Sequence, residues 1–526
     1  MFESAMKPIW WLPTVGFGFF LAIQFSMFVV PCRIFEDPGV GRHLRTAEVI
    51  LETGQIPRTD PLSFTKAGQP WIDFEWAFEA TIGELYRAGG LPLVCAFCYA
   101  IFAATVLNVF RMLLNSVLSV SAVVLCTGVV GLTLSLHFAV RPVLFTYLFM
   151  ALVVEVWQRR AQPLRRDWLL LPVIFAAWAN LHAGWLAALV FLALAMFGRL
   201  LDRLLKRVDG EEAPLIPWIS LTVLCALATW LNPWGWGLHR HIFLMATTLK
   251  SAALWDEYLP PNFTTPTMSA IAVLFVLVVV FMARASRRVP PWRWEAVLPV
   301  LFFLYEGLKA QRHVLLLMEI AAVPVARDLE ALLQSPGPPF LRAWFSVFSD
   351  LHSTVEDRFP VLSDIFSFIA DRFRQFPARQ RTAGGDAWLS LVAALVLTAL
   401  FMQTPIGNKI EVGRNVTPKL IAFLRDHPDR FHRPLTTTAN AGPLLWNMRP
   451  DFRVSIDDRG DFYGDGSVFA FNDMTRGAAG WEEKFQKGNY DSLILDPYLQ
   501  LNQLLHLLPE WKKVYCDKNV VVYWKD

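Results

Sequence analysis

Cysteine and charged residues are scarce in this chain. It contains six cysteines in 526 residues, and four of them, Cys95, Cys98, Cys126 and Cys225, lie inside long apolar runs. We therefore expect no structural disulfide, and Cys95-x-x-Cys98 within such a run is typical of small packing residues, not of a redox or metal motif. Charged residues make up 18% of the chain, and the net charge of +3 does not indicate binding to nucleic acid.

The chain also lacks the features of a cleavable signal peptide. Its first apolar run, residues 10–32, is longer than the apolar core of a signal peptide, and no small-residue cleavage site follows it. We expect this run to be retained as the first membrane span.

Hydrophobic residues dominate the composition. They make up 55% of the chain, and the mean hydropathy is +0.39, which is more than a soluble core requires. Apolar runs of about 17–25 residues can cross a bilayer as helices. Runs of this kind, of which the fifth is short, cover residues 10–31, 91–113, 117–138, 140–158, 168–181, 183–200, 215–231, 266–284, 292–309, 312–331 and 387–403. The sequence therefore predicts a polytopic α-helical membrane protein with about 11 transmembrane helices.

The distribution of positive charge predicts the orientation. Arginine and lysine are concentrated in every second short loop, for example at Arg111, Arg159, Arg203 and Arg287. Loops of this kind are cytoplasmic. We therefore expect a multi-pass protein of the bacterial inner membrane, with a cytoplasmic N-terminus and with residues 33–90 and the C-terminal tail on the periplasmic face.

The apolar runs divide the chain into four parts. Residues 1–331 are predicted to form a transmembrane domain whose first outward loop is 33–90, and residues 387–403 form the last span. Between them, residues 332–386 mix aromatic side chains with arginine and aspartate, which indicates amphipathic helices along the cytoplasmic membrane face or, alternatively, a docking surface for a partner. Residues 404–526 are predicted to form a periplasmic domain.

The first outward loop begins with two adjacent carboxylates, Glu36 and Asp37, followed by His43. Acids at the mouth of a membrane span are costly, so their presence indicates a functional site. The alternative for Asp37 is a helix-capping acid or an ion pair with Arg33 or Arg42.

The same loop is predicted to contain two helices. The first ends at Gly54, which suits a C-cap. The second begins after Asp73 as N-cap and ends at the pair Gly89 and Gly90.

The C-terminal tail alternates β-rich and helical patterns. The β-rich runs cover 434–438, 452–456, 492–495, 513–516 and 520–524, and helices are predicted at 481–486 and 498–508. These patterns predict a small α/β domain. The second run leads into an acidic loop, 457–465, which lacks the EF-hand spacing and is either a turn held by aspartates or a contact for a saccharide or metal ion. Its candidate residues are Asp457, Arg459, Asp461 and Tyr463.

Unusual polar residues gather on the predicted outer side of the spans. Candidate pocket residues are Asn180, His182, Asn232 and Glu257. Candidate cations are Arg141, Lys309, Arg312 and His313. A membrane-embedded site requires such groups to meet at one depth in the bilayer. The alternative interpretation is that the arginines reach the lipid headgroups and that the histidines are ordinary interfacial residues.

A carboxylate near the headgroups together with several cations suits a lipid-linked phosphosugar, whose phosphate and sugar lie at the membrane surface. In an inverting glycosyl transfer, Asp37 is expected to accept the proton of the acceptor hydroxyl and to stabilise positive charge at the anomeric carbon. Glu36 and His43 are expected to assist it. The four cations are expected to bind the leaving lipid phosphate.

Several motifs resemble a family of bacterial polytopic proteins related to the GT-C glycosyltransferases. In the first loop these are Asp37-Pro-Gly-x-Gly-x-His43, Gly68-x-x-Trp71 and Glu75-Trp76. Further matching pieces are Arg141-Pro142, Trp178-x-Asn180-x-His182, Asn232-Pro-x-Gly235, Arg312-His313 and Asp457-x-Arg459-x-Asp461-x-Tyr463-Gly464. The resemblance covers most of the chain.

This resemblance implies a fold and an activity. Members of the GT-C class, which includes protein O-mannosyltransferases and the catalytic subunits of oligosaccharyltransferases, keep a catalytic aspartate in the first outward loop, and Asp37 matches that position. The resemblance implies a polyprenyl-phosphate-linked sugar donor and a lipid, glycan or protein acceptor on the outer face of the membrane. We therefore expect a glycosyltransferase of the cell envelope.

Two other functions stay open, namely a transporter of a lipid-linked saccharide and a non-catalytic scaffold of an envelope or polysaccharide pathway. Inverted repeats would favour the transporter, and none is apparent. The sequence predicts no metal site, since His239-x-His241 lacks a carboxylate partner at a defined spacing. A divalent cation, Mg²⁺ or Mn²⁺, that bridges Glu36 or Asp37 to the phosphate is kept as an alternative.

Overall fold

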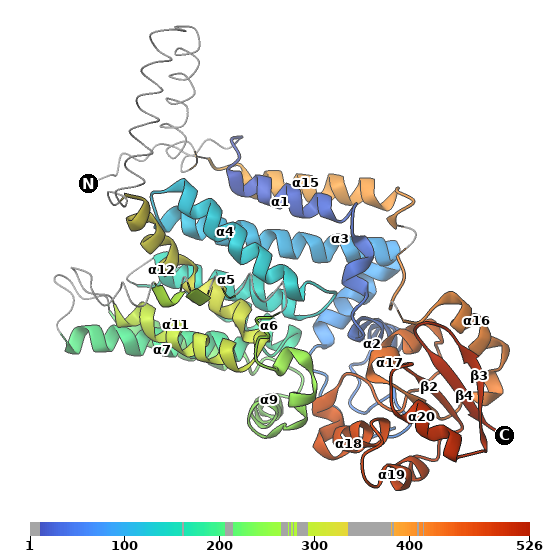
Figure 1. The fold of residues 1–526 in the computed structure, drawn as a ribbon. Helices are drawn as coiled ribbons and strands as arrows, with labels where there is room; N and C mark the ends of the chain where they lie inside the picture. Colours follow the sequence, from blue (N-terminus) through green and yellow to red (C-terminus); the bar gives the residue numbers. More distant parts are fainter. Residues whose placement is uncertain are drawn as a thin grey trace.

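The computed structural model describes residues 11–159, 162–205, 214–264, 272, 275–276, 278–280, 293–334, 380, 383–407, 410–413 and 415–526. A helical part lies next to a small domain at the C-terminal end of the chain (Figure 1). Most of the predicted insertion at 332–386 and most of the predicted span at 266–284 lie outside the described residues.

The helical part consists mainly of apolar helices. They are α1 (Val15–Ser26), α3 (Trp76–Ser116), α4 (Val120–Leu134), α5 (Val143–Arg159), α6 (Asp167–Leu181), α7 (Trp185–Leu204), α8 (Ile216–Ala228), α9 (Trp236–Thr248), α11 (Trp294–Lys309), α12 (Val314–Gln334) and α15 (Asp386–Met402). Every predicted span except 266–284 coincides with one of them, whereas α9 was not predicted. Among the described helices, α3, α7 and Val120–His137, which includes α4, are long and apolar enough to cross a membrane. The orientation stays a prediction.

The first loop contains the two helices that the sequence predicts. The helix α2 (Gly39–Thr53) ends at Gly54, which has the left-handed conformation that favours glycine. The second predicted helix forms the first part of α3, and the second predicted span forms the rest. The two parts meet at a break, where Gly90 has a φ of 66°.

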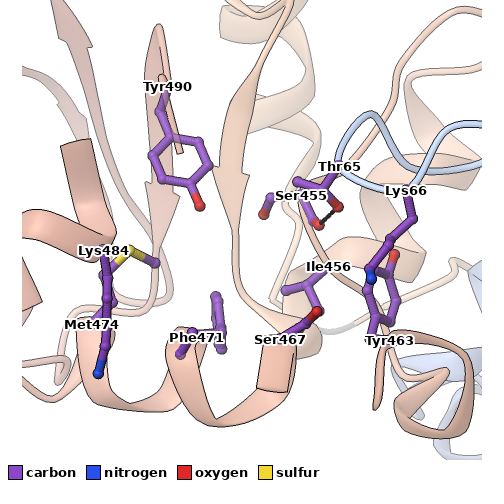
Figure 2. A pocket seen from close by; sticks show the side chains of 11 residues that line it. Thr65, Lys66, Ser455, Ile456, Tyr463, Ser467, Phe471, Met474, Lys484 and Tyr490 are labelled. Atoms are coloured by element: carbon purple, nitrogen blue, oxygen red, sulfur yellow. Dashed lines mark hydrogen bonds between the residues drawn. The ribbon is translucent and has the colours of Figure 1, made fainter. Parts of the chain in front are cut away.

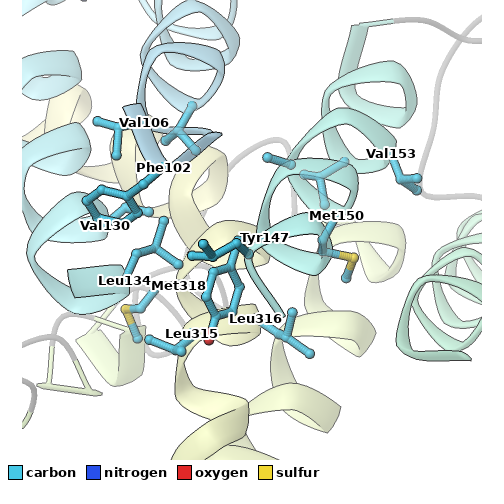
Figure 3. Close-up of a cluster of buried hydrophobic side chains, with 14 of the residues drawn as sticks. Phe102, Val106, Val130, Leu134, Tyr147, Met150, Val153, Leu315, Leu316 and Met318 are labelled. Atoms are coloured by element: carbon cyan, nitrogen blue, oxygen red, sulfur yellow. The ribbon is translucent and has the colours of Figure 1, made fainter. Parts of the chain in front are cut away.

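Large side chains interlock in the core of the helical part. Phe102 of α3, Tyr147 of α5 and Met318 of α12 lie together and are at most 5% exposed (Figure 3). Tight packing of this kind stabilises helix association in a bilayer, where lipid and side chains are equally apolar. It also holds together the first turns of α5 and α12, which directly follow Arg141 and Arg312 in the sequence.

The C-terminal domain has a four-stranded sheet with strand order β1-β2-β4-β3, in which β1 and β2 are parallel and the other pairs are antiparallel. The strands are β1 (Pro434–Thr436), β2 (Ser492–Leu495), β3 (Trp511–Cys516) and β4 (Val521–Lys525). The helices are α16 (Pro418–Asp426), α17 (Thr438–Asn447), α18 (Gly460–Thr475), α19 (Trp481–Lys487) and α20 (Leu501–Leu504). The predicted small α/β domain is confirmed.

Two local predictions for this domain are wrong. The run 452–456 forms no strand of the sheet, because Val454 pairs instead in an isolated bridge with Ser63 of the first loop. The predicted loop 457–465 becomes helical at Gly460, where α18 begins. Both differences arise because this segment packs against the first loop.

Two glycines allow the C-terminal domain to contact the first loop closely. A Cβ atom on Gly41 of α2 would overlap the backbone of Gly442 in α17, and a Cβ atom on Gly442 would overlap the carbonyl of Pro38. Only glycine permits this approach of two backbones. An ion pair between Arg449 and Glu48 at 3.2 Å joins the same two segments. The first loop and the C-terminal domain therefore form one unit around Asp37.

Candidate functional site

Asp37 lies in the short turn between the 3-10 helix η1 (Pro31–Phe35) and α2. Its Oδ1 accepts a hydrogen bond from the backbone N–H of Gly39 at 2.9 Å, which holds the side chain in place. Its Oδ2 lies 2.7 Å from a guanidinium nitrogen of Arg141. The ion-pair partner is thus Arg141, not Arg33 or Arg42. Both side chains are partly exposed, so a ligand can reach them.

Glu257 extends this ion pair into a cluster. One of its carboxylate oxygens lies 2.9 Å from Arg141 and the other lies 3.2 Å from Arg312. The Arg312 guanidinium also lies 4.4 Å from the centre of the Tyr258 ring. Burial raises the pKa of Glu257, but Arg312 and Arg141 outweigh this effect and hold the pKa below its ordinary value. Glu257 is therefore ionised near neutral pH and lies between two cations.

The C-terminal domain contributes a second carboxylate beside Asp37. A Cβ atom on Gly39 would lie 2.7 Å from Asp458 Oδ2 and 3.2 Å from Asp37 Oδ1, so both carboxylates flank the same glycine. Asp458 also bonds to the buried Arg42 at 2.7 Å. Burial raises the pKa of Asp458, but the adjacent Arg42 holds it well below its ordinary value. Asp458 is therefore an anion at the edge of the cluster.

Arg42 is surrounded by further acids. Glu79 lies 3.0 Å and Glu75 lies 3.5 Å from its guanidinium group. Burial raises the pKa of Glu75 to about 8, although Arg42 opposes this shift. Arg42 therefore links the start of α3 to Asp458 of the C-terminal domain.

His43 contacts both Arg42 and Glu79. Its Nε2 lies 3.0 Å from Arg42 and its Nδ1 lies 2.9 Å from Glu79. Burial lowers the pKa of His43 well below its ordinary value, and Arg42 lowers it further. Since arginine only donates, the neutral ring accepts at Nε2 and donates from Nδ1 to Glu79. His43 thus orients the partners of Arg42, and its hydrogen bonds do not reach Asp37.

The four candidate pocket residues have different positions. Glu257 belongs to the cluster. His182 bonds to Thr146 at 2.7 Å, and its pKa is lowered to about 3, mainly by burial and then by Arg312, so the neutral ring lies near the cluster. Asn180 accepts from Trp76 at 2.9 Å, and Asn232 accepts from the N–H of Trp234 at 2.8 Å. Asn180 thereby joins α6 to α3, whereas Asn232 stabilises the turn at 229–235.

Three candidates lie apart from the cluster. Lys309 and His313 lie 3.8 Å and 3.5 Å from Glu306, and Lys309 is strongly exposed. Glu36 is an exposed residue at the end of η1. The structure thus brings Asp37 together with two of the four candidate cations.

The acidic segment of the C-terminal domain is occupied by internal contacts. Arg459 bonds to Asp457 at 2.6 Å and to Asp60 of the first loop at 2.8 Å, and the Tyr463 hydroxyl donates to Asp457 at 3.2 Å. These four side chains are at most 4% exposed. Asp461 pairs with His241 of α9 at 2.9 Å. The segment therefore attaches the C-terminal domain to the loop and to α9.

Sequence reasoning missed Asp458, Glu79 and the role of Arg42. Asp458 stands directly after Asp457, and no pattern distinguishes the aspartate that binds Arg459 from the one that faces Asp37. Glu79 could have been predicted from the sequence, since an acid one helical turn after Glu75 lies on the same helix face. Among the described residues, no group of three or more His, Cys, Asp or Glu side chains is arranged to hold a metal ion.

Comparisons with known proteins bear on the fold. No protein-family model and no curated protein matches the chain. The chain is similar to the apo oligosaccharyltransferase of Archaeoglobus fulgidus, with 9% sequence identity and a TM-score of 0.50 over 91% of this chain and 69% of that chain. It is also similar to ArnT of Cupriavidus metallidurans bound to undecaprenyl phosphate, with 13% identity and a TM-score of 0.46 over 96% of this chain and 97% of that chain. The predicted GT-C-like fold is confirmed.

Proposed function

We propose that this protein is a membrane glycosyltransferase that moves a sugar from a polyprenyl-phosphate donor to an acceptor hydroxyl on the outer face of the inner membrane. The observation that carries the proposal is the partly exposed cluster of Asp37, Arg141, Glu257 and Arg312, in which the first-loop carboxylate pairs with Arg141 and Glu257 joins Arg141 to Arg312. The GT-C-like fold supports this class of reaction, with the chemistry argued from the cluster.

The two arginines suit the donor phosphate. In the free protein, one carboxylate, Glu257, lies between Arg141 and Arg312, and a phosphate offers several oxygens to the same pair of guanidinium groups. Binding of the phosphate to Arg141 weakens the pair between Arg141 and Asp37. The donor thereby frees the carboxylate that serves as base.

The transfer is a single displacement. The acceptor oxygen forms a bond to the anomeric carbon, the bond from that carbon to the phosphate oxygen breaks, and the electron pair leaves on the lipid phosphate. The proton of the acceptor hydroxyl passes to Asp37, which also stabilises positive charge at the anomeric carbon. The sugar is therefore transferred with inversion. Arg141 and Arg312 stabilise the leaving phosphate through bonds that strengthen as its charge develops.

The test compares wild type, Asp37→Asn and Asp256→Asn at equal membrane abundance. Asp256 is an exposed acid beside Glu257 and serves as the matched control. Proteoliposomes are supplied with a panel of undecaprenyl-phosphate sugars and an envelope extract as acceptor, and the release of lipid phosphate is measured. We expect Asp37→Asn to lose at least about 99% of the transfer, within the range that one general base contributes, and Asp256→Asn to retain it. Transfer that persists in Asp37→Asn would show that Asp37 is not the base, and a wild type that transfers no sugar would favour a scaffold or a transporter.

A further inference from the structure

A cavity of about 200 Å³ lies between the first loop and the C-terminal domain. Lys66 comes from the loop, Ser467 and Phe471 come from α18, and Tyr490 comes from the segment before β2. Figure 2 shows Tyr490 on one side of this space and the side chains of α18 on the other. None of the residues that line the cavity belongs to the cluster around Asp37.

Three polar groups line the cavity with unused hydrogen-bonding capacity. In the described part of the chain, the Ser467 hydroxyl, the Tyr490 hydroxyl and the Lys66 ammonium group form no hydrogen bond or ion pair with another residue. Burial raises the pKa of Tyr490 to about 12, so its hydroxyl is a donor at neutral pH. The three groups therefore face a polar ligand or water.

The lining defines the chemistry of that ligand. Phe471 and Tyr490 offer aromatic surface to the apolar face of a sugar ring, while the hydroxyls offer hydrogen bonds to its edge. No acidic residue lines the cavity, and Lys484 at its edge is neutralised by Asp473 at 2.7 Å. Lys66 is thus the remaining cation, which matches one negative charge on the ligand.

The volume limits the size of the ligand. About 200 Å³ corresponds to roughly seven water molecules at about 30 Å³ each. This space accommodates one sugar residue and is smaller than the pockets of about 300–1,000 Å³ that hold larger ligands.

We propose that this cavity binds one acidic sugar residue of a saccharide through Lys66, Ser467 and Tyr490. The site lies close to the catalytic unit, because Tyr463 both lines the cavity and bonds to Asp457, which is adjacent to Asp458 in the chain. If the proposed transfer is correct, the cavity holds part of the acceptor. Binding itself does not depend on that proposal.

Isothermal titration of the detergent-solubilised full chain tests the site with three probes: glucuronate, glucose and inorganic phosphate. We expect glucuronate to bind at least tenfold more tightly than either other probe. Lys66→Gln and Tyr490→Phe should each weaken glucuronate binding at least fivefold, and Tyr490→Phe retains the ring contacts with Phe64 and Phe485. The control Lys512→Gln, which changes an exposed lysine of the same domain, should have no effect.

Three outcomes overturn the inference. They are glucuronate binding no tighter than glucose, phosphate binding as tight as glucuronate, and glucuronate binding that both variants leave unchanged. Asp37→Asn should bind glucuronate like wild type. Glucuronate binding by a wild-type protein that transfers no sugar would reject the proposed function and leave this site standing.

Discussion

Replacing Arg459 by methionine should weaken the attachment of the C-terminal domain to the first loop. The Arg459 guanidinium bonds to Asp457 of its own domain and to Asp60 of the loop, and it lies 4.5 Å from the centre of the Trp71 ring. Methionine replaces the apolar stem but not the charge. The substitution therefore leaves two buried carboxylates without their cation.

The size of the effect follows from the remaining contacts. Removing one partner of a buried ion pair costs about 3–5 kcal/mol. Asp60 still accepts from the N–H groups of Leu62 and Ser63, and Asp457 still accepts from Tyr463, so we expect a value near 3 kcal/mol. The C-terminal domain lies in size between domains that lose about 4–8 °C and domains that lose about 2–4 °C in Tm for each kcal/mol, so a value of about 4 °C applies. The expected decrease in Tm is therefore roughly 12 °C.

Thermal unfolding of the purified full chain, followed by tryptophan fluorescence, measures this decrease. The matched control is Arg476→Met, which changes an exposed arginine at the end of α18 and should alter the free energy of unfolding by less than about 0.5 kcal/mol. The triple variant that adds Asp60→Asn and Asp457→Asn should regain part of the loss, because no buried charge is left unpaired. A decrease below about 3 °C for Arg459→Met would refute a role in attachment.

Three further predictions concern the same unit. Gly41→Ala should lower Tm and transfer together, because its Cβ overlaps the backbone of Gly442, whereas Gly18→Ala, which meets no atom within 4 Å, should not. Burial raises the pKa of Glu75 from 4.5 to about 8, so the wild-type protein should lose stability as the pH rises through this interval. In a series of Tm values measured against pH, Glu75→Gln should remove most of that loss. Asp458→Asn should reduce transfer at least tenfold in the liposome assay with unchanged membrane abundance, and full activity would show that this carboxylate is dispensable.

The apolar spans and local stop signals were predictable because they depend on neighbouring residues. An apolar run has to match the thickness of the bilayer, and Gly54 ends α2 through its own backbone freedom. Four of the five predicted strands belong to the sheet. The remaining one, 452–456, failed because its β-rich composition does not reveal that it pairs with the segment around Ser63, almost 400 positions away.

The candidate site was predictable in its residue types but not in its pairing. Asp37, Arg141, Glu257 and Arg312 were all expected on one side of the membrane, yet Lys309 and His313, which were expected to bind the same phosphate, lie with Glu306 instead. The pairing depends on distances of a few Å between helix ends, and these are set by side-chain packing across the whole helical part.

Composition and periodicity are enough to specify a polytopic helical protein with a small α/β domain. The reason is that the length of an apolar run and the residues that favour a turn are local properties of the sequence. Which charged groups meet depends on how distant segments pack. Asp457 and Asp458 illustrate this difference, since neighbours in sequence bind Arg459 and Arg42 in different surroundings. Coulomb interactions depend on distance in space, and only the packed chain brings residue 458 to residue 42.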